Sequence, residues 1–103
     1  MKKILVVGAG FMGSGIAQVC AQAGYQVHLM DIEATVTERA LRDIRWSVEK
    51  LATKGLVREP PQKVLARILP EKDLSSASTA DWVIEAAFEA EELKAEIFQE
   101  LDR

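Results

Sequence analysis

The chain has 103 residues, with 13 lysines and arginines against 16 aspartates and glutamates, and its formal net charge is −3. Hydrophobic residues make up 49% of it, which suits one folded domain or part of one and excludes a disordered chain. The small, mixed charge argues against nucleic acid or an anionic membrane surface as a partner. A single cysteine allows no internal disulfide, and no metal site is expected because cysteines and histidines are not clustered.

The N-terminus imitates a secretory signal peptide, because a basic start is followed by an apolar run that ends in small residues at 21–23. Four glycines interrupt this run and make it a poor hydrophobic helix. No other stretch approaches the roughly 20 apolar residues that span a bilayer. We therefore expect a cytoplasmic protein.

Strands and helices are predicted to alternate along the chain. Apolar, β-branched runs predict strands at 3–7, 25–30, 67–69 and 82–87. Amphipathic stretches predict helices at 13–23, 34–53, 62–66 and 91–101, and residues 74–80 are expected to be turn-like. This order predicts an α/β, Rossmann-like doubly wound fold with a mostly parallel sheet of about four strands in the order 3-2-1-4.

Particular residues refine these predictions. Gly24 and Gly55 are placed to end the first two helices. Pro70 predicts that the third strand is short and lies at a sheet edge. The apolar face of the first helix is expected to hold Ile16, Val19, Cys20 and Ala23, and that of the second Leu41, Ile44, Val48 and Leu51.

The strongest pattern is Gly8-Ala9-Gly10-Phe11-Met12-Gly13, a G-x-G-x-x-G loop between a predicted strand and a predicted helix. Gly8 permits the tight turn out of the strand, and Gly10 lets a pyrophosphate approach the backbone. Gly13 lets the helix pack close to the strand, and Gly15 is expected to be a second close-packing position. The helix start then offers N–H groups and the positive end of its dipole to phosphates.

Asp31 ends the second predicted strand, about 20 residues beyond the loop, where an acid accepts hydrogen bonds from the adenosine ribose. A carboxylate there would repel a 2′-phosphate, and Ile32 adds no positive charge, so NAD is predicted rather than NADP. Two alternatives stay open at this point. The glycines could serve turns only while Asp31 caps a loop, and flavin enzymes share the same loop.

Four blocks of sequence, at 8–18, 54–55, 81–86 and 94–102, resemble the NAD-binding domain of the L-3-hydroxyacyl-CoA dehydrogenases, including the bacterial 3-hydroxybutyryl-CoA dehydrogenases. This family oxidises the 3-hydroxyl of an acyl-CoA thioester to a ketone in fatty acid metabolism and β-oxidation, with NAD as the hydride acceptor. The resemblance implies CoA contacts from Ser47 and Lys54. It implies cofactor contacts from Gly8, Gly10, Phe11, Met12, Gly13, Ser14, Gly15, Asp31, Glu89 and Lys94.

Several of these residues also have ordinary structural interpretations. A lysine such as Lys54 is favoured near a helix C-terminus by the dipole, and a mid-helix serine such as Ser47 usually faces water. Glu89 and Lys94 could form a surface pair. Outside the resemblance, we expect core or packing roles for Cys20, His28, Trp46 and Trp82.

In the family that the chain resembles, the catalytic histidine, its orienting glutamate and the assisting Ser and Asn all lie beyond Arg103. Residues 1–103 are therefore expected to be the N-terminal part of the NAD-binding domain, without a catalytic residue. The resemblance places the acyl-covering helical domain, which also forms a homodimer, outside this chain. We expect the isolated chain to bind cofactor weakly and to be marginally stable or oligomeric, since its last strand leaves an open edge.

Two other functions remain open from the sequence. One is a stand-alone NAD-binding module without turnover. The other is a related Rossmann β-hydroxyacid dehydrogenase that acts on free acids rather than on CoA thioesters.

Overall fold

A computed structural model describes residues 2–86 of the chain. The elements, in chain order, are β1 (Lys3–Val7), α1 (Phe11–Gln22), β2 (Gln26–Met30), α2 (Ala34–Thr53), α3 (Pro61–Leu65), β3 (Ile68–Glu71), the 3₁₀ helix η1 (Leu74–Thr79) and β4 (Trp82–Glu85). The predicted helix at 91–101 lies outside the described residues. None of the helices within 2–86 is long and apolar enough to cross a membrane.

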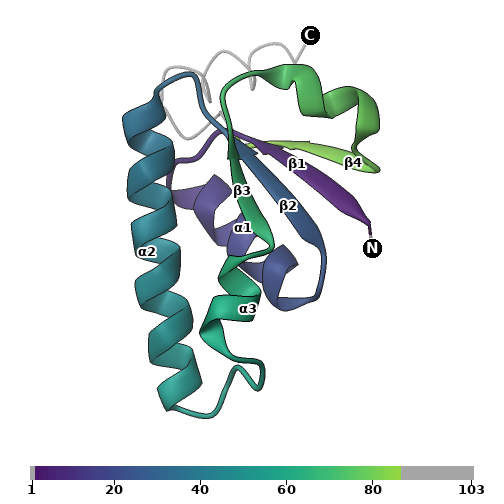
Figure 1. The fold of residues 1–103 in the computed structure, drawn as a ribbon. Helices are drawn as coiled ribbons and strands as arrows, with labels where there is room; N and C mark the ends of the chain where they lie inside the picture. The colour runs from purple at the N-terminus through teal and green to yellow at the C-terminus, as the bar shows by residue number, and fades with distance from the viewer. Residues whose placement is uncertain (1, 87–103) are drawn as a thin grey trace, which may run out of the picture.

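The strands form one parallel sheet in the order β3-β2-β1-β4, which confirms the predicted fold class and strand order (Figure 1). The central strand β1 pairs with β2 on one side and β4 on the other. β3 is an edge strand, as Pro70 predicted, but it continues through that proline to Glu71. An edge strand accommodates a residue without an N–H because one of its sides has no ladder partner.

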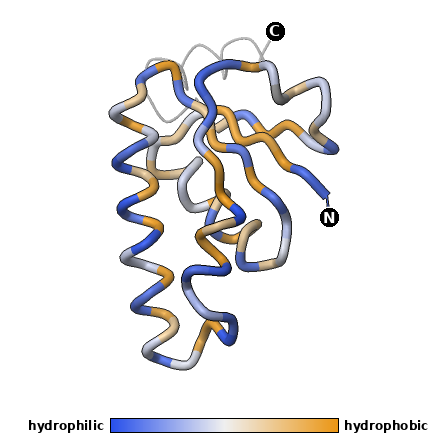
Figure 2. The backbone as a smooth tube through the Cα atoms, in the orientation of Figure 1, coloured by the Kyte–Doolittle hydropathy of each residue, from blue (hydrophilic) through white to orange (hydrophobic). Residues whose placement is uncertain are grey.

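The three α-helices lie on one side of the sheet, where α1 packs against the strands and α2 packs against α1 and α3 (Figure 1). The core on that face joins Val6 and Leu29 of the strands to Ile44 and Val48 of α2 and Val64 of α3, all nearly without exposed surface. Figure 2 shows this distribution as hydrophobic colour along β1 and β2 and as alternating colour along α2. The burial of one stripe of α2 confirms the predicted amphipathic helix.

The helix α1 presents a stripe of small residues to the sheet. Gly13, Ala17 and Ala21 are buried, at the i, i+4, i+8 spacing of one helix face. The predicted apolar face was therefore wrong in part, because Val19 is 67% exposed and Ala23 caps the exposed end of the helix. At Gly13 a larger residue does not fit, since a Cβ there would lie 1.7 Å from the carbonyl oxygen of Gly8.

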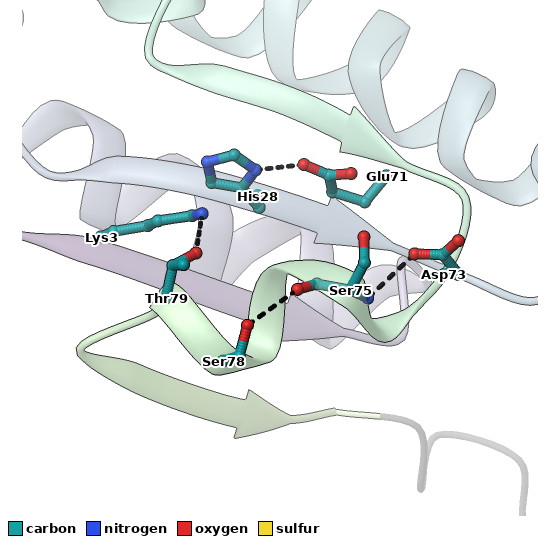
Figure 3. Close-up of polar contacts among 7 residues, drawn as sticks. All are labelled: Lys3, His28, Glu71, Asp73, Ser75, Ser78 and Thr79. Carbon is teal, nitrogen blue, oxygen red and sulfur yellow. Dashed lines mark hydrogen bonds and ion pairs between the residues drawn. The ribbon is translucent and has the colours of Figure 1, made fainter.

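The opposite face of the sheet carries polar pairs and η1 (Figure 3). Lys3 Nζ donates a hydrogen bond to Thr79 Oγ1 at 2.6 Å. Buried His28 contacts Glu71 through Nδ1, which agrees with its expected structural role. The segment predicted as turn-like forms a 3₁₀ helix, and Asp73 Oδ1 caps its start by accepting the N–H of Ser75 at 2.9 Å.

Candidate nucleotide-binding site

The glycine-rich loop turns directly from β1 into α1. Gly8 has a φ of +103°, a conformation that favours glycine, and its N–H donates to the carbonyl of Met30 at 2.7 Å. Gly10 is the N-cap of α1 and has no side chain to cap the helix. No capping side chain therefore covers the first turn, which suits an incoming phosphate.

Gly13 is required where the helix crosses the loop. A Cβ at this position would lie 1.7 Å from the carbonyl oxygen of Gly8, so no larger residue fits. This confirms the predicted close approach of helix and strand. The same prediction for Gly15 was wrong, because a Cβ there would meet nothing within 4 Å.

Asp31 lies beside the loop and is bonded to it. Its Oδ2 accepts the N–H of Ala9 at 2.9 Å, and its Oδ1 accepts the N–H of Glu33 at 3.0 Å. A carboxylate offers about four acceptor positions, so each oxygen keeps capacity for a further donor. Two hydroxyls of one ribose match that capacity. The neighbouring Ile32 is 91% exposed and adds no positive charge.

The N-terminal end of α1 is open to solvent. Phe11 is 94% exposed and Met12 is 46% exposed, so neither side chain fills the space in front of the first turn. The hydroxyl of Ser14 donates to the carbonyl of Phe11 at 2.9 Å. A phosphate contact from this hydroxyl would require it to rotate away from that carbonyl.

A groove of about 830 Å³ runs between α1 and α2 and begins at the same Phe11. Ser47 lines it, and its Oγ accepts a hydrogen bond from Gln18 at 2.9 Å rather than facing open water. Lys54 is exposed at the C-cap of α2, about 10 Å farther along the helix axis. The two predicted CoA residues therefore share one helix but do not form a cluster.

Trp46 also lines this groove, and its expected packing role was wrong. The side chain is 65% exposed, with the ammonium of Lys50 4.6 Å from the ring centroid. Trp82 is half-exposed and makes an edge contact with Tyr25, so packing accounts for it only in part. Cys20 is partly buried at the groove, and this burial raises the pKa of its thiol.

The remaining predicted contacts, Glu89 and Lys94, lie outside the described residues. The last described residue, Ala86, donates its N–H to the carbonyl of Val7 at 2.7 Å, so the chain leaves β4 beside the loop. Within 2–86, no group of three or more histidine, cysteine, aspartate or glutamate side chains could hold a metal ion.

The sequence did not predict a role for Arg39, which lines a cavity next to Gly10. Only the tertiary placement of α2 against the loop could have indicated it.

The sequence matches the family described as 3-hydroxyacyl-CoA dehydrogenase, NAD binding domain, over residues 3–103. A 3-hydroxyadipyl-CoA dehydrogenase of Escherichia coli (strain K12) is 39% identical over 102 residues, which are 98% of this chain and 22% of the relative. A 3-hydroxybutyryl-CoA dehydrogenase of Bradyrhizobium diazoefficiens is 40% identical over 102 residues, covering 98% of this chain and 35% of the relative.

Solved structures agree with these relatives. The crystal structure of (S)-3-hydroxybutyryl-CoA dehydrogenase from Ralstonia eutropha superposes with a TM-score of 0.80 at 33% identity, covering 99% of this chain and 36% of that one. A 3-hydroxybutyryl-CoA dehydrogenase from Escherichia coli K12 gives 0.79 at 40% identity, covering 97% and 21%. The chain thus spans between about a fifth and a third of the length of these relatives.

The match extends over nearly the whole chain, and the strand order is the predicted one. The family described by the match is an NAD-binding domain, which confirms the prediction of NAD as the cofactor. The chain therefore belongs to the NAD-binding domain family of the 3-hydroxyacyl-CoA dehydrogenases.

Proposed function

We propose that this chain is the N-terminal part of the cofactor-binding domain of an enzyme that oxidises L-3-hydroxyacyl-CoA thioesters to 3-ketoacyl-CoA. The names of the relatives support the substrate class. The observation that carries the proposal is the carboxylate of Asp31, fixed beside the loop by the N–H of Ala9. A carboxylate in this position favours a dinucleotide without a 2′-phosphate, because it would repel that group.

In this proposal the diphosphate lies against the backbone from Gly10 to Met12, at the open start of α1. Gly8 and Gly13 shape the turn, and Asp31 accepts the hydroxyls of the adenosine ribose. Ser14, Gly15, Glu89 and Lys94 complete the proposed contacts with the cofactor. The bound nicotinamide would supply the hydride acceptor.

We further propose that the CoA moiety follows the groove between α1 and α2, with Ser47 and Lys54 as its contacts. Gln18 holds the hydroxyl of Ser47 in the groove by donating to it, which leaves the proton of that hydroxyl for a polar group of CoA. Lys54 is exposed and can pair with a phosphate as a flexible point charge.

The catalytic base is proposed to come from outside residues 1–103. His28 does not serve, because it is buried on β2 against Glu71. A cytoplasmic homodimer completes the proposal and rests on the resemblance to the family.

The test is the oxidation of NADH by the enzyme that contains this chain, with acetoacetyl-CoA or free acetoacetate as the second substrate. The proposal expects turnover with the thioester and little with the free acid. Equal turnover of both would favour a β-hydroxyacid dehydrogenase. Tight NADH binding without any turnover would favour a binding module.

A further inference from the structure

A small cavity beside the start of α1 is lined by a cationic residue, Arg39, which has no role in the site proposed above. Its volume is about 190 Å³, below the roughly 300–1,000 Å³ of pockets that enclose a whole small ligand. It therefore has room for one part of a dinucleotide. The residues that line it are Ala9, Gly10, Phe11, Ser14, Val36, Arg39, Ala40 and Asp43.

Arg39 is the only cationic residue among those lining this cavity. Its side chain is exposed, and within the described part of the chain it makes no ion pair or hydrogen bond. Asp43 follows it by four residues on the same helix face, but a basic residue before an acidic one is the less favourable order for such a pair. The guanidinium is therefore left for another anion.

The charges around the loop favour such a cation. Asp31 is bonded to the N–H of Ala9, and Asp43 lines the cavity, so two carboxylates lie around the place where an anionic diphosphate would sit. The start of α1 contributes only about half a positive charge through its dipole. Unless a side chain compensates, the carboxylates would oppose the cofactor's phosphates.

We propose that Arg39 binds the diphosphate of NAD from the α2 side, opposite the backbone of Gly10. The planar guanidinium donates two parallel hydrogen bonds, a geometry that matches phosphate oxygens. This proposal rests on the cofactor site proposed above and adds to it the side chain that offsets Asp31 and Asp43. It assigns a binding role to a helix residue outside the glycine-rich loop.

The experiment measures NAD and CoA affinities by calorimetry at low and high salt, in the enzyme that contains this chain. Arg39→Gln removes the cation, and Arg39→Lys keeps the charge without the planar fork. Arg42→Gln is the matched control, because Arg42 is exposed, lies on the same helix and lines a different hollow. It makes the same change in net charge.

We expect Arg39→Gln to weaken NAD binding about tenfold at low salt and less at high salt, since salt screens an exposed pair. The NAD affinity of Arg39→Lys should lie between those of Arg39→Gln and the unsubstituted enzyme. Arg42→Gln should change the NAD affinity little. Equal losses from Arg39→Gln and Arg42→Gln would overturn the proposal. The proposal would also be overturned if Arg39→Gln lost the same NAD affinity at low and high salt and had a lower melting temperature.

The CoA titration separates the two sources of a diphosphate. Weaker CoA binding with unchanged NAD affinity in Arg39→Gln would show that Arg39 belongs to the substrate site, and would contradict the proposal. Failure of the unsubstituted enzyme to bind NAD would instead contradict the proposed function itself. If the enzyme binds NAD and substitution of Arg39 does not change the affinity, only the role of Arg39 is contradicted.

Discussion

Two glycines only two residues apart, Gly13 and Gly15, look equivalent in the sequence, yet they lie on different sides of α1 and have different roles in the structure. A Cβ at Gly13 would meet the carbonyl of Gly8 at 1.7 Å, whereas a Cβ at Gly15 would enter open space. The motif predicted the first contact because the spacing G-x-G-x-x-G encodes it. It could not distinguish Gly15, since the surroundings of an outward helix position depend on tertiary structure.

Alanine at each position should separate these roles. Gly13→Ala should destabilise the fold by about 1–3 kcal/mol or more, because the new methyl group overlaps backbone that cannot yield. Gly15→Ala should stabilise it by up to about 1 kcal/mol, since alanine is the better helix former at an exposed position. Urea unfolding measures both changes. Similar stabilities for the two variants would contradict the contact assigned to Gly13.

In the proposed site, Asp31 sets the preference for NAD over NADP. The double substitution Asp31→Ser and Ile32→Arg removes the repelling carboxylate and adds a cation at an exposed position next to it. Each lost hydrogen bond to the charged group is worth about 1.5–3 kcal/mol, so the NAD/NADP affinity ratio should fall by about tenfold or more. Ile32→Arg alone is the control. A ratio that does not move in the double variant would remove Asp31 from the ribose site.

Among the elements, the sequence predicts the strands and α2 better than it predicts α1 and η1. The helix α2 has the predicted bounds, because a long charged surface and one apolar stripe leave few alternatives. The inner face of α1 was misjudged because the residues buried there, Gly13, Ala17 and Ala21, are small rather than strongly hydrophobic. The 3₁₀ helix η1 was taken for a turn, since small polar residues are compatible with both.

One ion pair ties several elements together. Arg67 donates to both carboxylate oxygens of Glu59, at 2.8 and 2.6 Å, and to the carbonyl of Ala21 at 2.9 Å. It thus joins the segment after α2 to the end of α1 and the start of β3. The hydrogen bond from Arg67 holds the pKa of Glu59 below its usual value, against a smaller opposing effect of burial.

This lowered pKa predicts how stability depends on pH. The contribution of Glu59 is fully present above the unfolded carboxyl pKa, near 4.5, and is lost as the pH falls through the lower folded pKa. Glu59→Gln should therefore reduce the melting temperature at neutral pH and flatten its decline below pH 4.5. Glu49→Gln, at an exposed position of α2, is the control. The same pH curve for Glu59→Gln and the unsubstituted chain would contradict the role of this pair.

For the whole molecule, the order of strands and helices was sufficient to predict the parallel sheet and its strand order. A parallel sheet places its ligand where the connections from neighbouring strands diverge, and here β1 and β4 meet beside the glycine-rich loop. The groove lined by Trp46 and the cavity with Arg39 were not predictable. Both exist only because α2 packs against α1, and local periodicity does not specify that distance.

In the proposed site a diphosphate rests on bare backbone at the start of α1, and the substitution Gly10→Val would place a side chain in that position. Gly10 has φ −71° and an extended backbone, so a side chain there does not require a left-handed conformation. NAD should be titrated calorimetrically into the enzyme that contains this chain, with and without the substitution. We predict an affinity loss of about tenfold to a hundredfold with an unchanged melting temperature. Unchanged NAD affinity in a folded Gly10→Val protein would show that the diphosphate does not bind at the start of α1.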